Sequence, residues 1–267
     1  MNAPLALLKM RFLTGLQYRA AAAAGVLTQF FFGLVFIMVY VAFYRHAGPA
    51  QPMTLEEVAA YIWLQQIFFT FIMLWHSDYE LFDLITGGGI AYELCRPWRL
   101  YTVWYVKLLA ARLSACALRC LPIAAVVLFL PEPYGLSLPA SPEAFLLFVA
   151  ALLAGLLLVI AISMFVYLSV FWTMSPVGSI LLIAVAGEFF AGMVIPVPLM
   201  PDWMRQIAHL LPFRWTVDFP FRVYTGHIGA QEAIAGIGGQ LVWLAVLVAA
   251  GRWLMGRALR RVVVQGG

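Results

Sequence analysis

Two long stretches without a charged side chain constrain this chain more than any other feature. Residues 20–44 contain no Asp, Glu, Lys or Arg, and neither do residues 144–187. A helix needs about 20 consecutive, mostly apolar residues to cross the hydrocarbon core of a bilayer. The first stretch suits one crossing. The second is too long for one, and Ser-Pro-Val-Gly at residues 175–178 is a turn signal within it.

The composition excludes other classes of protein. The chain has 267 residues, of which 64% are hydrophobic and 10% are charged, whereas soluble domains have roughly 45–50% apolar and about 25% charged residues. A water-soluble enzyme would lack polar side chains for its surface, and disorder requires low hydrophobicity and high net charge. We therefore predict an all-α, polytopic membrane protein, with one transmembrane domain over residues 1–267.

Hydropathy predicts six transmembrane helices, and the basic residues orient them. The approximate spans are 20–44, 58–76, 104–130, 144–172, 178–197 and 234–254. With the N-terminus inside, ten Lys and Arg residues flank the cytoplasmic ends and four the outer ends, as the positive-inside rule requires. We attribute the net charge of +4 to the basic residues that flank the helices on the cytoplasmic side, and not to a nucleic-acid-binding site. The prediction is a multi-pass protein of the cell (inner) membrane with both termini cytoplasmic.

An amphipathic elbow, residues 77–100, joins the second and third spans on the cytoplasmic side. Leu81, Leu84 and Ile85 recur at helical spacing, and the acidic residues 78, 80 and 83 lie on the other side. Three glycines, residues 87–89, end this short helix. Such a helix suits docking onto a soluble partner; the alternative is a helix lying in the lipid interface. No Lys-Ser/Thr pair follows the glycines as a phosphate-binding loop requires, so we expect no ATP hydrolysis by this chain alone.

Of the charged residues inside the predicted spans, two lie deepest. Helical rise places Arg119 about 22 Å into the third span and Glu188 about 18 Å into the fifth. A charge at mid-bilayer costs about 2.5–3.5 kcal/mol, so such groups usually pair or face water. Three roles remain open: an ion pair between the two helices, a place on the transport path, or a dimer contact. If the third helix starts later, Arg112 extends to the interface and Arg119 lies shallower.

Paired aromatic residues are weaker candidates for substrate contacts. Packing or lipid contact is the alternative role of each, because aromatic side chains dominate cores as well. The candidates are Phe30, Phe31, Phe68, Phe69, Phe189 and Phe190.

Motifs in the elbow and in the C-terminal third are similar to those of a known family. Residues 87–97 read GGGIAYELCRP and resemble the pattern G-x-x-A-Y-E-L-L-R-P, with Cys95 where Leu is usual. The fourth span ends in Phe-Trp-Thr, residues 171–173. The tail pattern "G-x-x-x-P, P-x-W, L-P-F, Y-x-G" corresponds to residues 192–196, 201–203, 211–213 and 224–226. The chain resembles the permease subunits of ABC type-2 exporters, in the six-helix branch with a separate ATPase.

This resemblance implies a transmembrane subunit that moves a hydrophobic or amphipathic substrate out of the cytoplasm or inner leaflet by alternating access. It implies ATP-binding cassette ATPase subunits as partners, a second permease subunit of the same or another kind, and lipid contact. ATP and Mg would be held by the ATPase, with no cofactor or metal in this chain. The segment 198–233 would be an outer re-entrant element. The residues expected to couple to the ATPase are Asp78, Glu80, Leu81, Asp83, Leu84, Gly87, Gly88, Gly89, Tyr92, Glu93, Arg96 and Pro97.

Two other functions compete with this interpretation. A channel or secondary transporter would be expected to show inverted repeats, and the two halves show no convincing match. An intramembrane enzyme needs a nucleophile with a base, or a metal-binding set, at membrane depth. The four histidines, residues 46, 76, 209 and 227, lie at span ends or outside the spans, and none is part of an HExxH motif. We therefore expect no catalytic residue.

Overall fold

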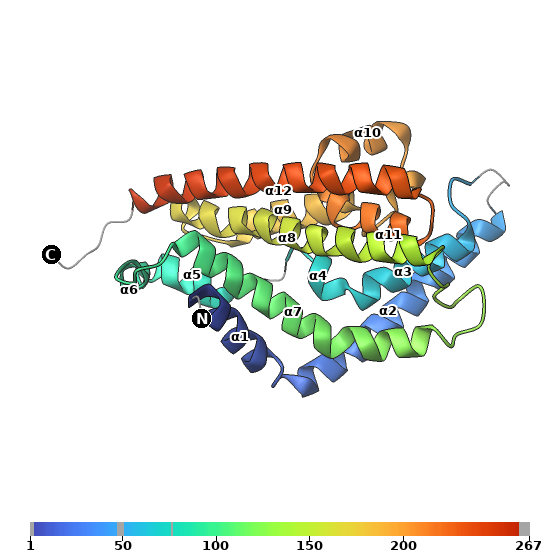
Figure 1. Ribbon diagram of the computed structural model, residues 1–267, viewed down its shortest axis with the longest axis horizontal. Helices are drawn as coiled ribbons and strands as arrows, with labels where there is room; N and C mark the ends of the chain where they lie inside the picture. The colour runs from blue at the N-terminus through green and yellow to red at the C-terminus, as the bar shows by residue number, and fades with distance from the viewer. Residues whose placement is uncertain (1–2, 47–50, 76, 262–267) are drawn as a thin grey trace.

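The computed structural model describes residues 3–46, 51–75 and 77–261 as helices and connecting turns, with no strand among them. It confirms the all-α polytopic fold (Figure 1). The helices are α1 (Ala3–Gly15), α2 (Arg19–His46), α3 (Leu55–Ile67), α4 (Phe69–Ile72), α5 (Tyr79–Thr86), α6 (Ile90–Leu94), α7 (Leu100–Val127), α8 (Pro142–Thr173), α9 (Val177–Ala191), α10 (Asp202–Leu210), α11 (Asp218–Tyr224) and α12 (Ala230–Leu259), with 3₁₀ turns η1 (Val197–Leu199) and η2 (Phe213–Thr216).

Four helices, α2, α7, α8 and α12, are long and apolar enough to cross a membrane, and α9 is a shorter apolar helix. α8 is the most buried of the four; it packs against α12, α11 and α7. α2 instead exposes large apolar side chains such as Leu27 and Met38. A water-soluble protein would bury such side chains, so this exposed apolar surface agrees with a membrane protein.

Local signals explain where several helices begin and end. Thr54 caps α3 through its hydroxyl, and the Glu57 carboxylate accepts a hydrogen bond from the Thr54 amide, which completes a capping box. Ser141 caps α8, with Pro142 in the first turn. α8 ends at Thr173 and α9 begins at Val177, so the turn expected at residues 175–178 is present.

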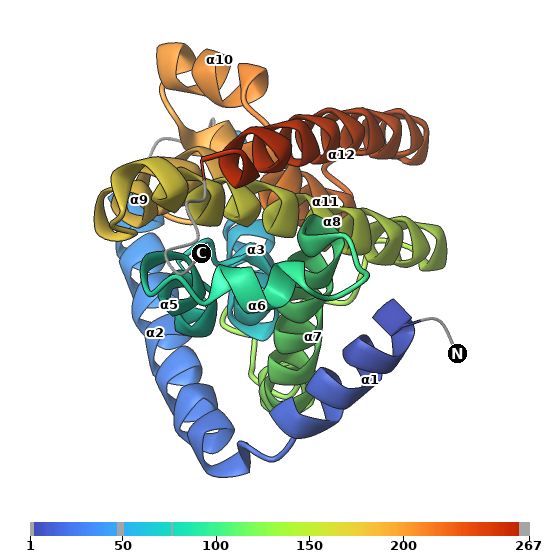
Figure 2. The same cartoon turned by 90° about the vertical axis from the view of Figure 1, so that its left-hand side faces the viewer.

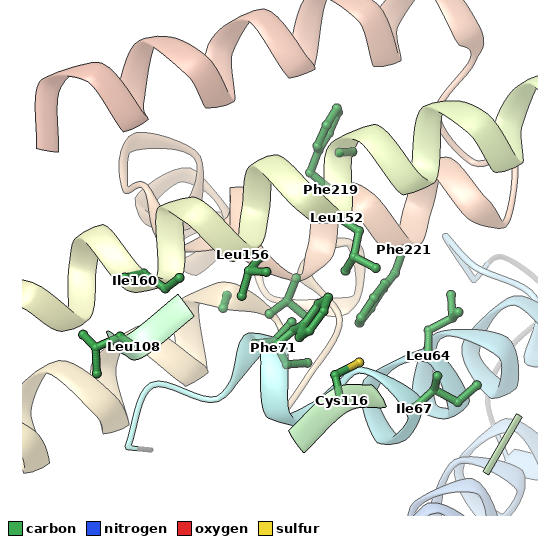
Figure 3. Close-up of a cluster of buried hydrophobic side chains, with 14 of the residues drawn as sticks. Leu64, Ile67, Phe71, Leu108, Cys116, Leu152, Leu156, Ile160, Phe219 and Phe221 are labelled. Atoms are coloured by element: carbon green, nitrogen blue, oxygen red, sulfur yellow. The ribbon is translucent and has the colours of Figure 1, made fainter. Parts of the chain in front are cut away.

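The second span is not one continuous helix. α3 ends at Ile67, α4 adds one turn, and Met73–Trp75 are not helical. The expected end of this span, residue 76, lies outside the described residues. α4 sits in the middle of the molecule, below α8 (Figure 1), and its Phe71 belongs to the same buried cluster as Leu152 and Leu156 of α8 (Figure 3). The span is therefore broken inside the protein and not at its surface.

The fifth helix is also shorter than the expected 178–197, because α9 ends at Ala191. Gly192 follows with φ +90°, and a Cβ there would lie 2.6 Å from the Tyr61 hydroxyl oxygen. Only glycine fits this left-handed, crowded position. The chain then turns through η1, α10, η2 and α11 before α12 begins, so short helices occupy the region beyond the end of α9.

The elbow lies at one end of the molecule. α5, α6, the start of α7 and the end of α12 gather at the left in Figure 1, and the ends of α2 and α7 lie at the right. Viewed from the left-hand end, α5 and α6 lie in front of the bundle (Figure 2). α1, a helix that the hydropathy analysis missed, packs along α7 beside them.

Candidate functional site

The first half of the elbow is a helix with one side packed into the protein. The Asp78 carboxylate caps α5 by accepting a hydrogen bond from the Glu80 amide at 3.0 Å. Leu81, Phe82 and Ile85 are buried, and the Phe82 ring stacks on Tyr167 of α8 with centroids 4.7 Å apart. The predicted amphipathic helix is present, and its apolar side faces the protein's own core.

A glycine turn separates the two helices of the elbow. Gly88 has φ +75°, which side-chain-bearing residues rarely adopt. Gly87 has ordinary backbone angles, but a Cβ there would lie 2.8 Å from the Asp83 carbonyl oxygen. α6 follows and buries Ile90. The three glycines therefore let the chain reverse within a few residues.

The expected coupling residues divide into an inward and an outward set. Leu81 is buried and Leu84 half-buried, so they hold α5 in place. Glu93 forms an ion pair with Arg96 at 3.2 Å. The exposed residues include Asp83, Tyr92, Arg96 and Pro97 and the aromatic rings of Tyr79 and Trp98; Glu80, Gly87 and Gly88 are exposed too, but Glu80 is ion-paired and the glycines have no side chain. We name the first six of these residues the outer elbow face.

Glu80 joins the elbow to two other helices. Its carboxylate lies 3.0 Å from the Arg11 guanidinium of α1 and 3.7 Å from the Lys107 ammonium of α7. Burial, followed by the neighbouring Glu80, raises the pKa of the Asp78 carboxyl. The elbow is thus fixed by charged contacts as well as by its apolar side.

The break in the second span is held by a buried arginine. Nη1 of Arg112 donates to three main-chain carbonyls, those of Thr70 at 3.1 Å, Phe71 at 3.3 Å and Met73 at 2.7 Å. Nη2 of Arg112 lies 3.3 Å from the Ser163 hydroxyl. Carbonyls at the end of a helix lack intrahelical partners, and no water is present in a bilayer core to replace them. Arg112 therefore satisfies the freed carbonyls of α4.

Glu188 of α9 holds the backbone amide that follows the Met73 carbonyl. Its carboxylate accepts a hydrogen bond from the Leu74 N–H at 3.2 Å. A few residues later, the Asp78 N–H donates to the Tyr167 hydroxyl at 2.7 Å. Between α4 and α5, Met73 is thus held by α7, Leu74 by α9 and Asp78 by α8. Hydropathy did not reveal the Tyr167 contact.

Of the three roles left open for Arg119 and Glu188, the ion pair between them is not present in the described part of the chain. In the described part of the chain, Arg119 has no carboxylate within 4.0 Å, and its buried Nε has no hydrogen-bond partner. The Arg119 guanidinium lies beside Gly25, where an added Cβ would be 2.6 Å from its central carbon. Gly25 is six residues from the start of α2, about 9 Å at helical rise. Along α7, Arg119 lies 19 residues from Leu100, about 28 Å at helical rise, so it lies far from the elbow end of that helix.

The six phenylalanines do not form one site. They come from three places: α2, the α3–α4 junction and α9. Phe30 stacks on Trp63 at 5.6 Å, whereas Phe31 is exposed. Phe68 lies edge-on to Phe148, and Phe189 to its neighbour Phe190; Phe69 is half-buried. These contacts support packing, and a substrate role stays a prediction for the side chains that remain exposed.

A second polar cluster lies in the segment after α9. Asp218 is fully buried; its carboxylate accepts from the Val197 amide at 3.2 Å and from Arg222 at 3.4 Å. Beside it is a cavity of about 470 Å³ whose wall includes Arg214 and His209. Burial and the nearby Arg214 lower the pKa of His209. These contacts fix the turn that follows Gly192.

Comparison with known families decides the class of protein. The sequence profile described as "ABC-2 family transporter protein" matches residues 30–266, well over half of the chain. The chain belongs to the ABC-2 transporter family. Searches among curated proteins and among solved structures gave no significant match. This ABC-2 protein is a multi-pass membrane subunit of a transporter and not an enzyme, and its family implies association with ATP-binding cassette ATPase subunits.

Proposed function

We propose that this ABC-2 protein is the permease of an exporter, which moves a hydrophobic or amphipathic substrate out of the cytoplasm or inner leaflet. In this proposal both termini are cytoplasmic, the membrane is the cell (inner) membrane, and ATP and Mg bind to separate ATPase subunits. A second permease subunit, identical or different, completes the transporter. The 198–233 segment forms the outer re-entrant element. Alternating access requires a ligand with different affinities for the two states.

One observation carries the proposal: the elbow presents an exposed face while being linked to the broken span. The outer elbow face is open, and the other side of α5 packs on α8. Only a few residues of chain separate α5 from Met73 and Leu74, which Arg112 and Glu188 hold, so movement of α5 would act on these two residues. Docking and movement of the ATPase at this face would therefore be transmitted to the centre of the membrane domain.

The test is co-purification with an ATPase encoded beside this chain, followed by ATP hydrolysis in proteoliposomes. Deleting the elbow would also remove the buried Leu81 and Phe82, so single variants of exposed residues are cleaner. Tyr92, which is 80% exposed, is changed in Tyr92→Ala. Phe129, which is 89% exposed and follows the end of α7 away from the elbow, is changed in Phe129→Ala as the control.

We expect Tyr92→Ala to reduce ATPase binding about tenfold or more, since a buried interface aromatic contributes about 2 kcal/mol or more. Phe129→Ala should bind as the wild type does. Equal binding by the wild type and by Tyr92→Ala would remove the elbow from the docking surface.

A further inference from the structure

The cavity of about 470 Å³ beside Asp218 is formed by α10, η2, α11 and the start of α12. Its volume suits a small molecule, since ligand pockets measure about 300–1,000 Å³. α12 begins here at Ala230 and ends beside the elbow, so the cavity lies at the end of α12 away from the elbow (Figure 1). It is therefore separate from the outer elbow face and from the broken span.

Three arginines from different elements line this cavity: Arg205 of α10, Arg214 of η2 and Arg222 of α11. His209 lines it too, and its pKa is lowered first by burial and then by each of the three arginines. A nearby positive charge disfavours the charged form of histidine, so all three arginines act on one place. The wall thus carries a concentration of positive charge.

Two of these arginines have carboxylate partners. Arg222 lies 3.4 Å from the buried Asp218 carboxylate, and Arg205 pairs with Asp202. Among the residues that the structure describes, Arg214 has no carboxylate within 4.0 Å. Charged side chains that leave water are normally paired, so the half-buried Arg214 lacks an anion.

The carboxylate on the cavity wall, that of Glu232, does not fill this role. Glu232 is exposed in the first turn of α12 and lies more than 4.0 Å from the Arg214 nitrogens. Water screens an exposed charge, so its attraction for Arg214 is weak. The second histidine of the wall, His227, faces Glu57 at 3.8 Å, and burial lowers the pKa of His227.

The buried hydrogen-bonding groups of the wall show the same shortage of anions. Nε of Arg214, Nε of Arg222 and Nε1 of Trp215 are buried without a partner. All three are donors, and no oxygen of the described wall residues is left in this state. Donors of this kind, above all those of arginine, are matched by the oxygens of a phosphate or carboxylate.

We propose that this cavity binds an amphipathic anion, with its phosphate or carboxylate at Arg214 and its apolar part against Phe219, Ile228 and Ala235 of the same wall. The anion supplies the counter-charge that Arg214 lacks. The site lies away from the elbow, so it does not depend on ATPase docking there.

The test uses the full-length chain purified in dodecyl maltoside, with binding measured by equilibrium dialysis and empty micelles subtracted. The probes are 1-naphthyl phosphate, which has both parts, and 1-naphthol and inorganic phosphate, which have one each. We expect 1-naphthyl phosphate to bind at least about tenfold more tightly than either. Equal binding of 1-naphthol would refute the role of the anion, and equal binding of inorganic phosphate would refute that of the apolar wall.

Two pairs of variants locate the binding. Arg214→Gln should weaken binding of 1-naphthyl phosphate about tenfold or more, whereas Arg45→Gln, an exposed cation outside the cavity wall, should bind as the wild type does. Ala235→Leu narrows the cavity without changing charge and should also weaken binding about tenfold. Ala245→Leu, exposed farther along α12, should not.

Thermal unfolding shows whether each variant is folded, and the alanine pair decides the question if Arg214→Gln is not. Wild-type affinity in a folded Arg214→Gln or in Ala235→Leu would overturn the proposal. Competition then distinguishes the two sources of such an anion. Displacement of the probe by phosphatidylglycerol but not by phosphatidylcholine would assign the anion to a lipid head group, and displacement by neither lipid would assign it to a water-soluble molecule. Equal displacement by both lipids would show that charge is not recognised and would overturn the proposal.

Discussion

Replacing Arg112 tests whether one buried guanidinium holds the broken second span. Arg112→Met keeps a long apolar side chain but removes every donor to the carbonyls of Thr70, Phe71 and Met73. A buried acceptor left without a partner costs about 1–3 kcal/mol. The three carbonyls share one donor nitrogen and the backbone relaxes in part, so the loss should be roughly 3–5 kcal/mol in total.

The assay is thermal unfolding of the purified chain in a neutral detergent without anionic lipid. In chains of 150–250 residues, 1 kcal/mol lowers the unfolding temperature by about 2–4 °C, so Arg112→Met should unfold about 6–20 °C below the wild type.

Arg119→Met is the matched control, since it removes the same charge from the same helix. Arg119 makes no hydrogen bond to the described part of the protein through its buried Nε, and no ion pair. Its loss should therefore cost less than about 1 kcal/mol, or under about 4 °C. Equal shifts in the two variants would refute the assignment of the carbonyl contacts as the cause.

Four further changes probe the same architecture. Glu188→Gln keeps an acceptor oxygen and should unfold near the wild-type temperature, whereas Glu188→Leu should lose about 1–3 kcal/mol. Gly192→Ala places a methyl group against Tyr61 at a positive φ and should destabilise by about 2 kcal/mol or more. An impermeant thiol reagent should modify the exposed Cys95 in inside-out vesicles but not in intact cells. The pKa of Asp78 is raised above its ordinary value of 3.8 in the folded chain. The free energy of unfolding should therefore fall as pH rises from 3.8 through the raised pKa. Asp78→Asn should remove that part of a pH–stability curve.

The sequence predicted helix ends and turns wherever these depend on the backbone conformation of neighbouring residues. The Ser-Pro turn at 175–178 and the glycines after α5 each act through the torsions of neighbouring residues. The amphipathic pattern of α5 likewise predicted its helix, and burial of Leu81 confirms which side faces the protein. These features needed no knowledge of distant contacts.

The break of the second span had no such signal. Residues 67–74 contain neither Gly nor Pro, so local propensity favours a continuous helix. The partners that stabilise the break are distant along the chain: Arg112 is 42 residues from Thr70, and Glu188 is 114 residues from Leu74. Helical rise gave depths for Arg119 and Glu188 but not the direction in which each side chain points, and so depth alone could not decide whether the two residues pair.

A broken span explains why arginine suits position 112. A helix interrupted inside a bilayer leaves carbonyls that no water can satisfy. The guanidinium carries five N–H donors on a planar group, whereas lysine offers three on one atom. Because α8 is continuous and α3 is capped and buried, the proposed function places any displacement of α5 on the residues just after α4, of which Met73, Leu74 and Trp75 are non-helical. Nη1 of Arg112 already contacts three carbonyls within 3.3 Å, so under that proposal the side chain that stabilises the break would keep a carbonyl partner as these residues shift.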